Sequence, residues 1–316
     1  MISLEAFFSW YLLPLKEELQ DIALRIAPLP ADFIGILRHY LDEERSTFTP
    51  YQIWNRRYVQ SMLCLLACEA CGGDWQQALP AAAAIELMQT AFLAHDEIRG
   101  KDAPQRKASA RASWGYAQEI NVGDTLFALA NLSLGQLCEC GVPAKTIVDA
   151  LYLLNCAGLA LSTGQHLHFS LEERGEIAIA DYLLMAEGKT ALAVYACEVG
   201  ALIASATDAQ RESLHSFGRH LGLAHYLCSS LRRKWDENRN ADAVDKSVVG
   251  ERFWQPGRRD FIEQLAQEQR ERAIKALEKG DLMGPAVQAL CELAQMPFSS
   301  EPLFCLTHDV ETLPCL

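Results

Sequence analysis

Apolar residues recur every three to four positions along almost the whole chain, which is the spacing of one face of an α-helix. No segment combines strict alternation with enrichment in β-branched residues, the pattern typical of a strand. The periodicity predicts helices over residues 4–26, 31–44, 50–71, 80–99, 106–119, 121–139, 144–164, 177–206, 208–239, 258–279 and 285–294. The chain is therefore predicted to be all-α.

Short breaks rich in glycine and proline separate the predicted helices. They fall at Pro28 and Pro30, Gly72 and Gly73, Gly141 to Pro143, Gly175, and Gly280. Only residues 238–250 form a longer polar and charged stretch, which we expect to be a mobile loop. Because no internal repeat and no linker divides the chain, residues 1–316 are predicted to form a single domain.

The composition narrows the range of partners. Half of the 316 residues are hydrophobic, enough for a large core, and the net charge of −13 argues against a nucleic acid or an anionic membrane surface as partner. The first fifteen residues lack the basic region and cleavage site of a signal peptide. Glu198 interrupts the longest apolar run, residues 190–207, so this run is expected to be a core helix and the chain not to be transmembrane.

The cysteines indicate a reducing compartment. Their number is eleven, which is odd, and their spacing is not that of a disulfide framework. We therefore expect free thiols in a cytoplasmic protein. Cys64, Cys68 and Cys71 share a predicted helix face, but no histidine or second cysteine pair completes a zinc site around them.

An acidic cluster ends the predicted helix that precedes Gly100. Asp96 and Glu97 fall in its last turn, where negative charge is unfavourable by ~0.3–1 kcal/mol for each group. In one interpretation the basic side chains that flank Gly100 neutralise the cluster. In the other, the chain folds back after Gly100, and Asp96, Glu97 and Asp102 together hold Mg²⁺, a cation that prefers oxygen ligands.

Further positions carry charge or small side chains. Arg106 and Lys107 place two cations soon after the acidic cluster, where they either bind a diphosphate or form an ordinary helix start. Lys189 is predicted to lie within an apolar helix, so it either binds an anionic ligand or extends to the surface. Gly218 and Gly222, four residues apart, are expected to let two helices pack closely.

Asn121 and Asp124 are predicted to lie at a helix start, where either side chain is a candidate cap. With this segment included, the ordered set of motifs resembles the trans-isoprenyl diphosphate synthase (polyprenyl synthetase) family. The matching motifs are Gly72-Gly73-Asp74, Ala81 to Leu87, Phe92 to Glu97, Asn121-x-Gly123-Asp124-x-Leu126, Gly164-Gln165, Lys189-Thr190-Ala191 and Phe217-Gly218-x-x-Leu221-Gly222-Leu223-Ala224. The resemblance spans roughly residues 56–235 and implies an isoprenoid-synthase-type helical bundle around a central apolar cavity.

The resemblance also implies a chemistry. In this family Mg²⁺ draws the diphosphate from an allylic prenyl diphosphate, and the double bond of isopentenyl diphosphate attacks the resulting carbocation. By analogy Asp96, Glu97 and Asp102 are the metal ligands, and Lys189 grips the leaving diphosphate.

The resemblance assigns roles to three more positions. Arg106 would bind the same diphosphate oxygens as Lys189. Gln165 would place a neutral dipole near the carbocation. Phe92, one turn before Asp96, is either the floor of the cavity, which favours a short prenyl product, or a residue of the core.

The sequence departs from the family at the second Asp-rich motif. The aligned positions carry Ser229, Ser230 and Arg233, and neither hydroxyl groups nor a guanidinium replace carboxylates as Mg²⁺ ligands. Asp236 and Glu237, two turns further along the same predicted helix, substitute for them only if the site is shifted.

The expected isopentenyl diphosphate pocket is also altered. Arg57 is the retained cation of the family's basic segment, and Gln89 stands where a histidine is expected. Lys107 replaces an arginine and therefore lacks the bidentate fork of a guanidinium. His168 replaces an aspartate.

Three hypotheses follow from these matches and departures. The first is a diverged enzyme that still transfers a prenyl group. The second is a terpene-synthase-like enzyme that ionises or cyclises an allylic diphosphate without isopentenyl diphosphate. The third is a non-catalytic partner subunit. The resemblance implies a homodimer, and the third hypothesis a heterodimer with a homologue.

Overall fold

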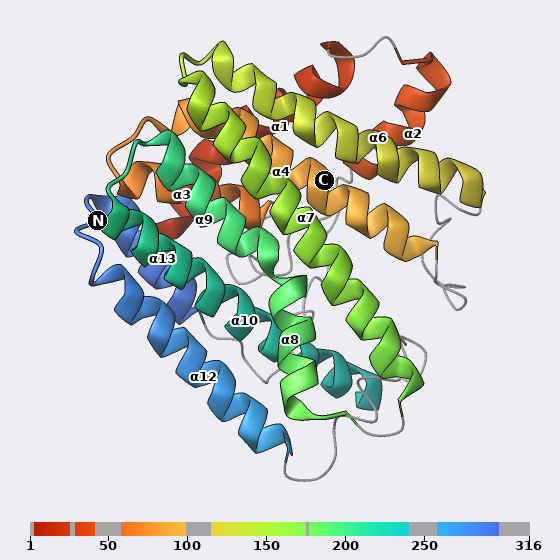
Figure 1. Ribbon diagram of the computed structural model, residues 1–316, viewed down its shortest axis with the longest axis vertical. Helices are drawn as coiled ribbons and strands as arrows, with labels where there is room; N and C mark the ends of the chain where they lie inside the picture. Colours follow the sequence, from red (N-terminus) through yellow and green to blue (C-terminus); the bar gives the residue numbers. More distant parts are fainter. Residues whose placement is uncertain are drawn as a thin grey trace, which may run out of the picture.

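The regular structure of the molecule is helical throughout the part that the computed structural model describes, residues 3–25, 29–41, 58–98, 115–174, 177–239 and 258–296 (Figure 1). The predicted all-α fold is confirmed. The α-helices are α1 (Leu4–Arg25), α2 (Ala31–Leu41), α3 (Val59–Ala70), α4 (Leu79–Glu97), α6 (Tyr116–Gly135), α7 (Ala144–Glu173), α8 (Ile179–Lys189), α9 (Ala191–Ile203), α10 (Asp208–Arg239), α12 (Arg258–Leu277) and α13 (Pro285–Gln295).

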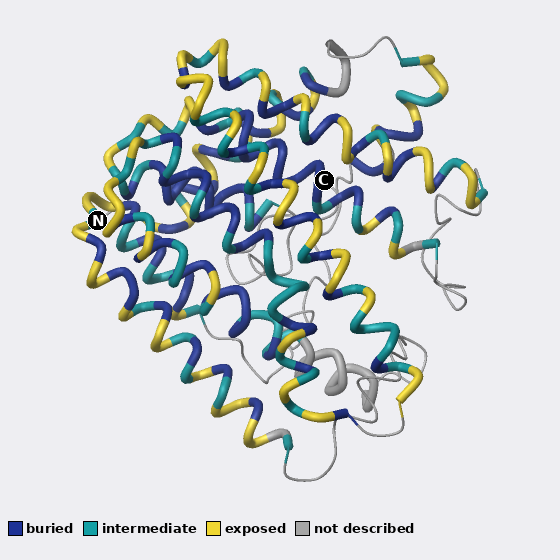
Figure 2. The backbone as a smooth tube through the Cα atoms, in the orientation of Figure 1, coloured by how far each residue is buried: buried dark blue, intermediate teal, exposed yellow. Residues whose placement is uncertain are grey.

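Helices α3, α4 and α9 form the centre of the bundle. Residues 61–68 of α3 and 80–88 of α4 are all buried, as the dark blue of Figure 2 shows. A helix that is apolar on every side is stable only when other helices surround it. Here α3 packs against α4, α9 and α13, and α6 packs along α4. The apolar run expected to be a core helix is confirmed as one, because most of α9 is buried.

Two clusters of buried residues divide the core. The larger cluster joins α1 to α4, α6, α9 and α13 with the first halves of α7 and α10 and the end of α12, in the upper and middle parts of Figure 1. The smaller one lies where the end of α7 meets α8, α10 and α12, in the lower part. Its buried members are Leu171, Ile177, Tyr182, Met185, Ala186, Leu223, Leu227, Ile262 and Ala266. The central apolar cavity stays a prediction, and so does the single domain.

The predicted helix start at Asn121 is wrong. Helix α6 begins five residues earlier, after Gly115, whose φ of 81° suits glycine and turns the chain into the helix. Asn121 and Asp124 therefore lie inside α6 and do not cap it. The polar side chains of this segment predicted a terminus because they are typical of caps, whereas here they occupy exposed positions of a continuous helix.

The predicted helix end at Gly164 is also wrong, because α7 continues to Glu173. Gly164 is buried within the helix and faces the backbone of α8. Because Gly164 has no side chain, α7 and α8 cross closely at this position. The glycine does not end the helix.

The helix predicted over residues 177–206 is in fact two helices. Helix α8 ends at Lys189 and α9 begins at Ala191, with Thr190 between them at φ −107° and ψ 7°. The hydroxyl of Thr190 donates to the carbonyl oxygens of Ala186 at 3.0 Å and Glu187 at 3.2 Å. These bonds satisfy carbonyl groups at the end of α8 and stabilise the break.

Within the part of the chain described here, α7 alone has the length and apolar composition of a membrane-crossing helix, and a third of its most apolar window is buried. The core helices of water-surrounded proteins pass the same test, so this finding is weak evidence for a span. The loop predicted at 238–250 lies outside the described residues from 240 onward.

Candidate functional site

The C-terminal end of α4 lies directly against α6. A Cβ at Gly123 would overlap the ring of His95, so the ring lies directly over this glycine of α6. The approach places the Asp124 Oδ1 atom 3.4 Å from the His95 Nε2 atom. Both side chains are solvent-accessible, at 41% for His95 and 70% for Asp124, so the pair lies at an open edge of the bundle.

Asp96 follows His95 in the last turn of α4, as predicted, and is exposed. An exposed carboxylate at a helix C-terminus suits a divalent cation, because the negative end of the helix dipole and the carboxylate both attract positive charge. The side chain of Glu97 and all of Asp102 lie outside the described residues. Within the described part, no three His, Cys, Asp or Glu side chains are grouped to hold a metal ion. The three-carboxylate magnesium site stays a prediction.

Helices α7 and α8 cross in backbone contact near the predicted catalytic pair. A Cβ at Gly164 would lie 2.8 Å from the Lys189 amide nitrogen, and a Cβ at Gly188 would lie 2.7 Å from the Gly164 Cα atom. The crossing sets Gly164, which precedes Gln165, against the backbone of Lys189 at the junction of α8 and α9. Gln165 and Lys189 are half-buried. The structure therefore joins the segments of two residues that are 24 positions apart in the chain.

Helix α10 closes the other side of the same junction. A Cβ at Gly222 would lie 3.0 Å from the Thr190 Cβ atom, and a Cβ at Gly218 would lie 2.7 Å from the Ala193 carbonyl oxygen. The close packing predicted for these two glycines is confirmed. Thr190 therefore lies between the last turn of α8, to which its hydroxyl is bonded, and helix α10. These contacts hold the residue at which α8 ends.

Further along α10, the altered second motif begins at Ser229. Its hydroxyl lies 3.4 Å from the His225 Nε2 atom, one turn earlier. A hydroxyl beside an imidazole does not replace a magnesium-binding carboxylate. The side chains of Ser230, Arg233, Asp236 and Glu237 lie outside the described residues, and so do Arg57, Arg106 and Lys107.

Two further residues of α4, Phe92 and Gln89, are half-buried. Phe92 packs against the larger core cluster, which fits the core interpretation and leaves the cavity floor a prediction. The Oε1 atom of Gln89 is buried, with no hydrogen-bond partner among the described residues. Because amide oxygen and nitrogen positions are interchangeable by a flip, Gln89 is able to present a donor there to an anion.

Glu86 has a structural role that the sequence pattern did not predict. This residue is fully buried within an apolar stretch of α4, and its Oε2 atom accepts a hydrogen bond from the amide of Tyr58 at 3.1 Å. Tyr58 has φ 81°, a conformation that costs a non-glycine residue about 1–2 kcal/mol. The carboxyl group of Glu86 inside an apolar run was a signal of such a role in the sequence, because a buried charge needs a partner.

His168, which stands in place of an expected aspartate, forms a pair with a carboxylate. Its Nε2 atom lies 3.2 Å from the Glu172 Oε1 atom one turn further along α7. A carboxylate is thus present at the edge of the smaller core cluster, shifted by one turn from its expected place.

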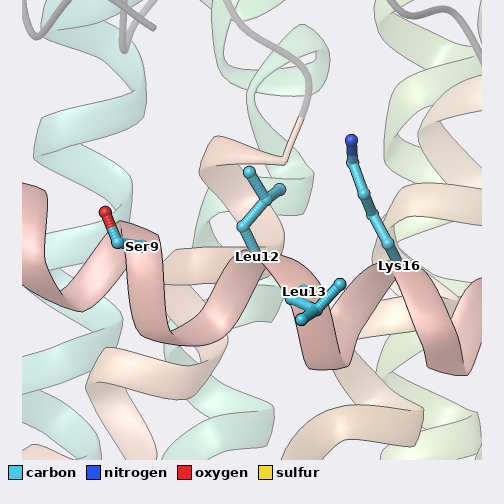
Figure 3. A pocket seen from close by; sticks show the side chains of 4 residues that line it. All are labelled: Ser9, Leu12, Leu13 and Lys16. Atoms are coloured by element: carbon cyan, nitrogen blue, oxygen red, sulfur yellow. The ribbon is translucent and has the colours of Figure 1, made fainter.

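A hollow among the described residues lies elsewhere. It is lined by Ser9, Leu12, Leu13 and Lys16, which all belong to α1 (Figure 3). It contains no predicted site residue and no converging acidic or basic groups, so it is not the candidate site.

The chain is similar in sequence to prenyl diphosphate synthases. The model of the polyprenyl synthetase family matches residues 55–227. A geranylgeranyl diphosphate synthase of Mycobacterium tuberculosis is 37% identical over 184 residues, which are 57% of this chain and 51% of that enzyme. A (2E,6E)-farnesyl diphosphate synthase of the same organism is 36% identical over 56% of this chain and 48% of its own length. The chain spans about half the length of the curated relatives it matches.

Solved structures match over a longer part of the chain. A geranylgeranyl pyrophosphate synthetase from Pyrococcus horikoshii has a TM-score of 0.75 at 23% identity, covering 92% of this chain and 97% of that one. A polyprenyl synthase from Caulobacter crescentus, crystallised with calcium and isoprenyl diphosphate, has a TM-score of 0.69 at 22% identity, covering 93% and 97%. At sequence identities of 22% and 23%, the structural similarity shows a shared fold and nothing further.

Proposed function

We propose, on the premise that this chain belongs to the polyprenyl synthetase family, that it is a prenyltransferase. It would break the carbon–oxygen bond of an allylic prenyl diphosphate and join the prenyl cation to the double bond of isopentenyl diphosphate. The new cation would then lose a proton to the released diphosphate, which leaves a longer prenyl diphosphate. The observation that carries the proposal is the backbone crossing at Gly164 and Gly188, which sets the segment that contains Gln165 against the backbone of Lys189. The names of the relatives, geranylgeranyl and farnesyl diphosphate synthases, support the same reaction class.

Lys189 would bind the leaving diphosphate. It is half-buried at the break between two helices, where reduced contact with water strengthens its attraction for an anion. Gln165 would direct the oxygen of its amide toward the cationic carbon left behind. As the charge on the diphosphate develops, the ammonium group stabilises it more strongly than in the ground state, which is the condition for catalysis.

Asp96, Glu97 and Asp102 would hold Mg²⁺, which supplies further neutralisation of the leaving diphosphate when bound. The exposure of Asp96 at the end of α4 supports its part in this set. Arg106 would contact the allylic diphosphate. We further propose that Phe92 limits the product to a short prenyl chain.

On the acceptor side, Arg57 and Lys107 would bind the diphosphate of isopentenyl diphosphate. Gln89 supports this placement, because the buried end of its amide has no hydrogen-bond partner within the described part of the chain. An amide N–H group at that end would complete the anion site.

A second candidate function is ionisation of an allylic diphosphate without isopentenyl diphosphate, as in terpene synthases. The observation that favours it is the altered acceptor side, where Lys107 stands in place of an arginine of the family and Arg57 is the retained cation of the basic segment. A non-catalytic subunit that associates with an active homologue is favoured instead by the pairing of Ser229 with His225 where the family has a metal-binding carboxylate.

A turnover assay separates these functions. The purified protein would receive ten-, fifteen- and twenty-carbon allylic diphosphates with Mg²⁺, each with and without isopentenyl diphosphate, and products would be read by mass spectrometry. A longer diphosphate establishes prenyl transfer. A hydrocarbon or alcohol formed without isopentenyl diphosphate establishes the second function. No turnover by folded protein contradicts both and supports the partner subunit.

We propose that the chain forms a dimer through α6 and α7. Exposed apolar residues follow one stripe of α7, with Val148 at 62%, Tyr152 at 71% and Leu159 at 70%. An apolar stripe of this kind on a surface is typical of a protein interface. An active protein would pair with a second copy, and a partner subunit with a homologue.

We also propose a cytoplasmic location. The nine cysteines within the described residues are all free thiols. Burial raises the pKa of the Cys71 thiol to about 11 and that of Cys68 to about 12, which keeps them protonated and unreactive. Free, inert thiols are what a reducing compartment favours.

A further inference from the structure

The last turn of α8 lies between two neighbouring helices, α7 on one side and α10 on the other (Figure 1). On the α7 side the contact is between backbones. A Cβ at Gly188 would lie 2.7 Å from the Gly164 Cα atom and 2.8 Å from the Ala160 carbonyl oxygen. This steric contact sets how closely the turn approaches α7, and a second contact is needed to fix its rotation on that surface.

An ion pair supplies a contact with α10. The Arg219 Nη2 atom of α10 donates to the Glu187 Oε1 atom of α8 at 2.6 Å, across 32 positions of the chain. The side chain of Arg219 is 55% exposed and that of Glu187 is 38% exposed. A pair this exposed shifts an equilibrium by at most about fivefold. Glu187 precedes Lys189 by two residues, so the pair is anchored in the turn that carries the lysine.

Thr190 attaches the chain to α10 on the other side of Lys189. Its hydroxyl group and its amide each donate to the Glu187 carbonyl oxygen at 3.2 Å. A Cβ at Gly222 of α10 would lie 3.0 Å from the Thr190 Cβ atom. Lys189 therefore lies between two residues in contact with α10, Glu187 through charge and Thr190 through packing. These contacts restrict the position from which the lysine side chain extends.

We infer that Arg219 is a positioning residue for Lys189, acting through the carboxylate of Glu187 and not through contact with substrate. The inference rests on the proposed role of Lys189 in binding the leaving diphosphate and deepens it. With the ion pair intact, the ammonium group would extend from a turn held on both sides. Without the pair, the turn would rotate on its α7 contact, and the ammonium group would spend less time where charge develops on the diphosphate.

Breaking the ion pair should lower kcat/KM for the allylic diphosphate about threefold to fivefold, the limit that an exposed pair sets. Arg219→Gln removes the cation, whereas Arg219→Lys keeps it and should stay within about twofold of the wild type. Because Arg219 also lowers the pKa of His215 and His220, the pair is broken from its other side as well. Glu187→Gln should give the same loss as Arg219→Gln. Calorimetric binding of inorganic diphosphate should weaken in the same order of variants.

A double substitution shows whether the pair acts through Lys189. In a Lys189→Ala background, Arg219→Gln should change kcat/KM by less than about 1.5-fold, because a positioning effect disappears with the group that is positioned. A pair that stabilises only the fold would give the same loss in both backgrounds. Arg174→Gln is the matched control, since it breaks a pair of similar exposure at the start of α8, from Arg174 Nη1 to Asp181 Oδ2 at 3.0 Å. This control should leave kcat/KM unchanged.

The outcomes separate the positioning role from the proposed function. A folded wild type without turnover overturns the proposed function, and the diphosphate affinities of the variants then still decide the positioning role. An active wild type in which Arg219→Gln and Glu187→Gln leave kcat/KM unchanged overturns only the positioning role. An equal loss in the Lys189→Ala background, or after Arg174→Gln, also overturns it. If Arg219→Gln does not fold, Glu187→Gln in both backgrounds decides.

Discussion

At the scale of single residues, burial and partners decide what each polar group does. Lys189 is half-buried at a helix junction, whereas Lys145 is 85% exposed and pairs with Asp149 one turn away at 2.6 Å. Two lysines of equal charge therefore have different expected roles. Only the first is shielded enough from water to bind a diphosphate strongly.

Lys189→Ala should lower kcat/KM for the allylic diphosphate by roughly tenfold to a hundredfold, the range for a lost charge-assisted hydrogen bond. Lys145→Ala is the matched control and should leave kcat/KM unchanged. Steady-state kinetics at saturating Mg²⁺ would measure both variants. Equal effects of the two substitutions would contradict the proposed role of Lys189.

Two histidines of α10 should give opposite pH dependences of stability. The hydrogen bond to Glu198 raises the pKa of His215, with Glu212 adding to the shift and burial and Arg219 opposing it. Burial lowers the pKa of His220, which lies 2.7 Å from Gln269. The stabilisation by His215 is thus complete below about pH 6.5 and disappears as the pH rises through its folded pKa. For His220 the sign is reversed, and stability is lost as the pH falls below about 6.5.

His215→Asn should lower the free energy of unfolding at about pH 5.5 by ~0.3–1 kcal/mol, since the pair is half-exposed, and by less at about pH 8.5. His220→Asn should remove a destabilisation that grows below about pH 6.5. Urea unfolding of both variants at the two pH values would test this. A similar pH dependence in both would contradict the assignment.

At the scale of helices, glycines set how closely elements approach. Gly164 lies at a crossing where a Cβ would meet the Lys189 amide nitrogen at 2.8 Å, whereas Gly135, the last residue of α6, has no atom within 4 Å of its Cβ position. The first glycine is required by packing and the second is not. The distance between α7 and α8 therefore depends on the missing side chains of Gly164 and Gly188.

Gly164→Ala should destabilise the protein by ~1–3 kcal/mol and lower prenyl transfer, because α8 and Lys189 must move away from Gln165. Gly135→Ala should be neutral or stabilising by up to ~1 kcal/mol, since alanine restricts the unfolded chain. Thermal unfolding and turnover would be measured for both. An active Gly164→Ala variant of unchanged stability would show that the crossing tolerates a side chain.

At the scale of the whole molecule, the exposed apolar stripe of α7 indicates an interface. Beside the stripe, the Asn155 Nδ2 atom of α7 donates to the Asn131 Oδ1 atom of α6 at 2.8 Å. This bond holds the two helices together as one surface. Burial of such a surface in a dimer gains roughly 25 cal/mol for each Å² of apolar area.

Tyr152→Glu should weaken the dimer at least about tenfold, because it removes apolar area and buries a charge. Its position is 71% exposed in the single chain, so the stability of the monomer should hardly change. Light scattering across a concentration series would measure the oligomeric state. An unchanged mass, or a wild type that is monomeric throughout, would contradict the proposed interface.

The sequence by itself determined much of the local structure. Periodicity predicted the helical fold, and the bounds of α10 agree with it at both ends, because a long amphipathic pattern has few alternatives. It also predicted that Asp96 lies in the last turn of a helix, since helix termini follow from local residues. The family resemblance selected the same segments that the structure brings together at the α7–α8 crossing.

Only the tertiary structure decided how the glycines and buried polar groups are used. Gly164 was predicted to end a helix, because sequence cannot distinguish a terminating glycine from one that faces another backbone. The break at Thr190 was missed, because the apolar residues on both sides continue the same period. Glu86 bonds to Tyr58 across 28 positions, a pairing that depends on which helices become neighbours. Contacts between distant segments arise from packing of the whole bundle, and local pattern does not contain them.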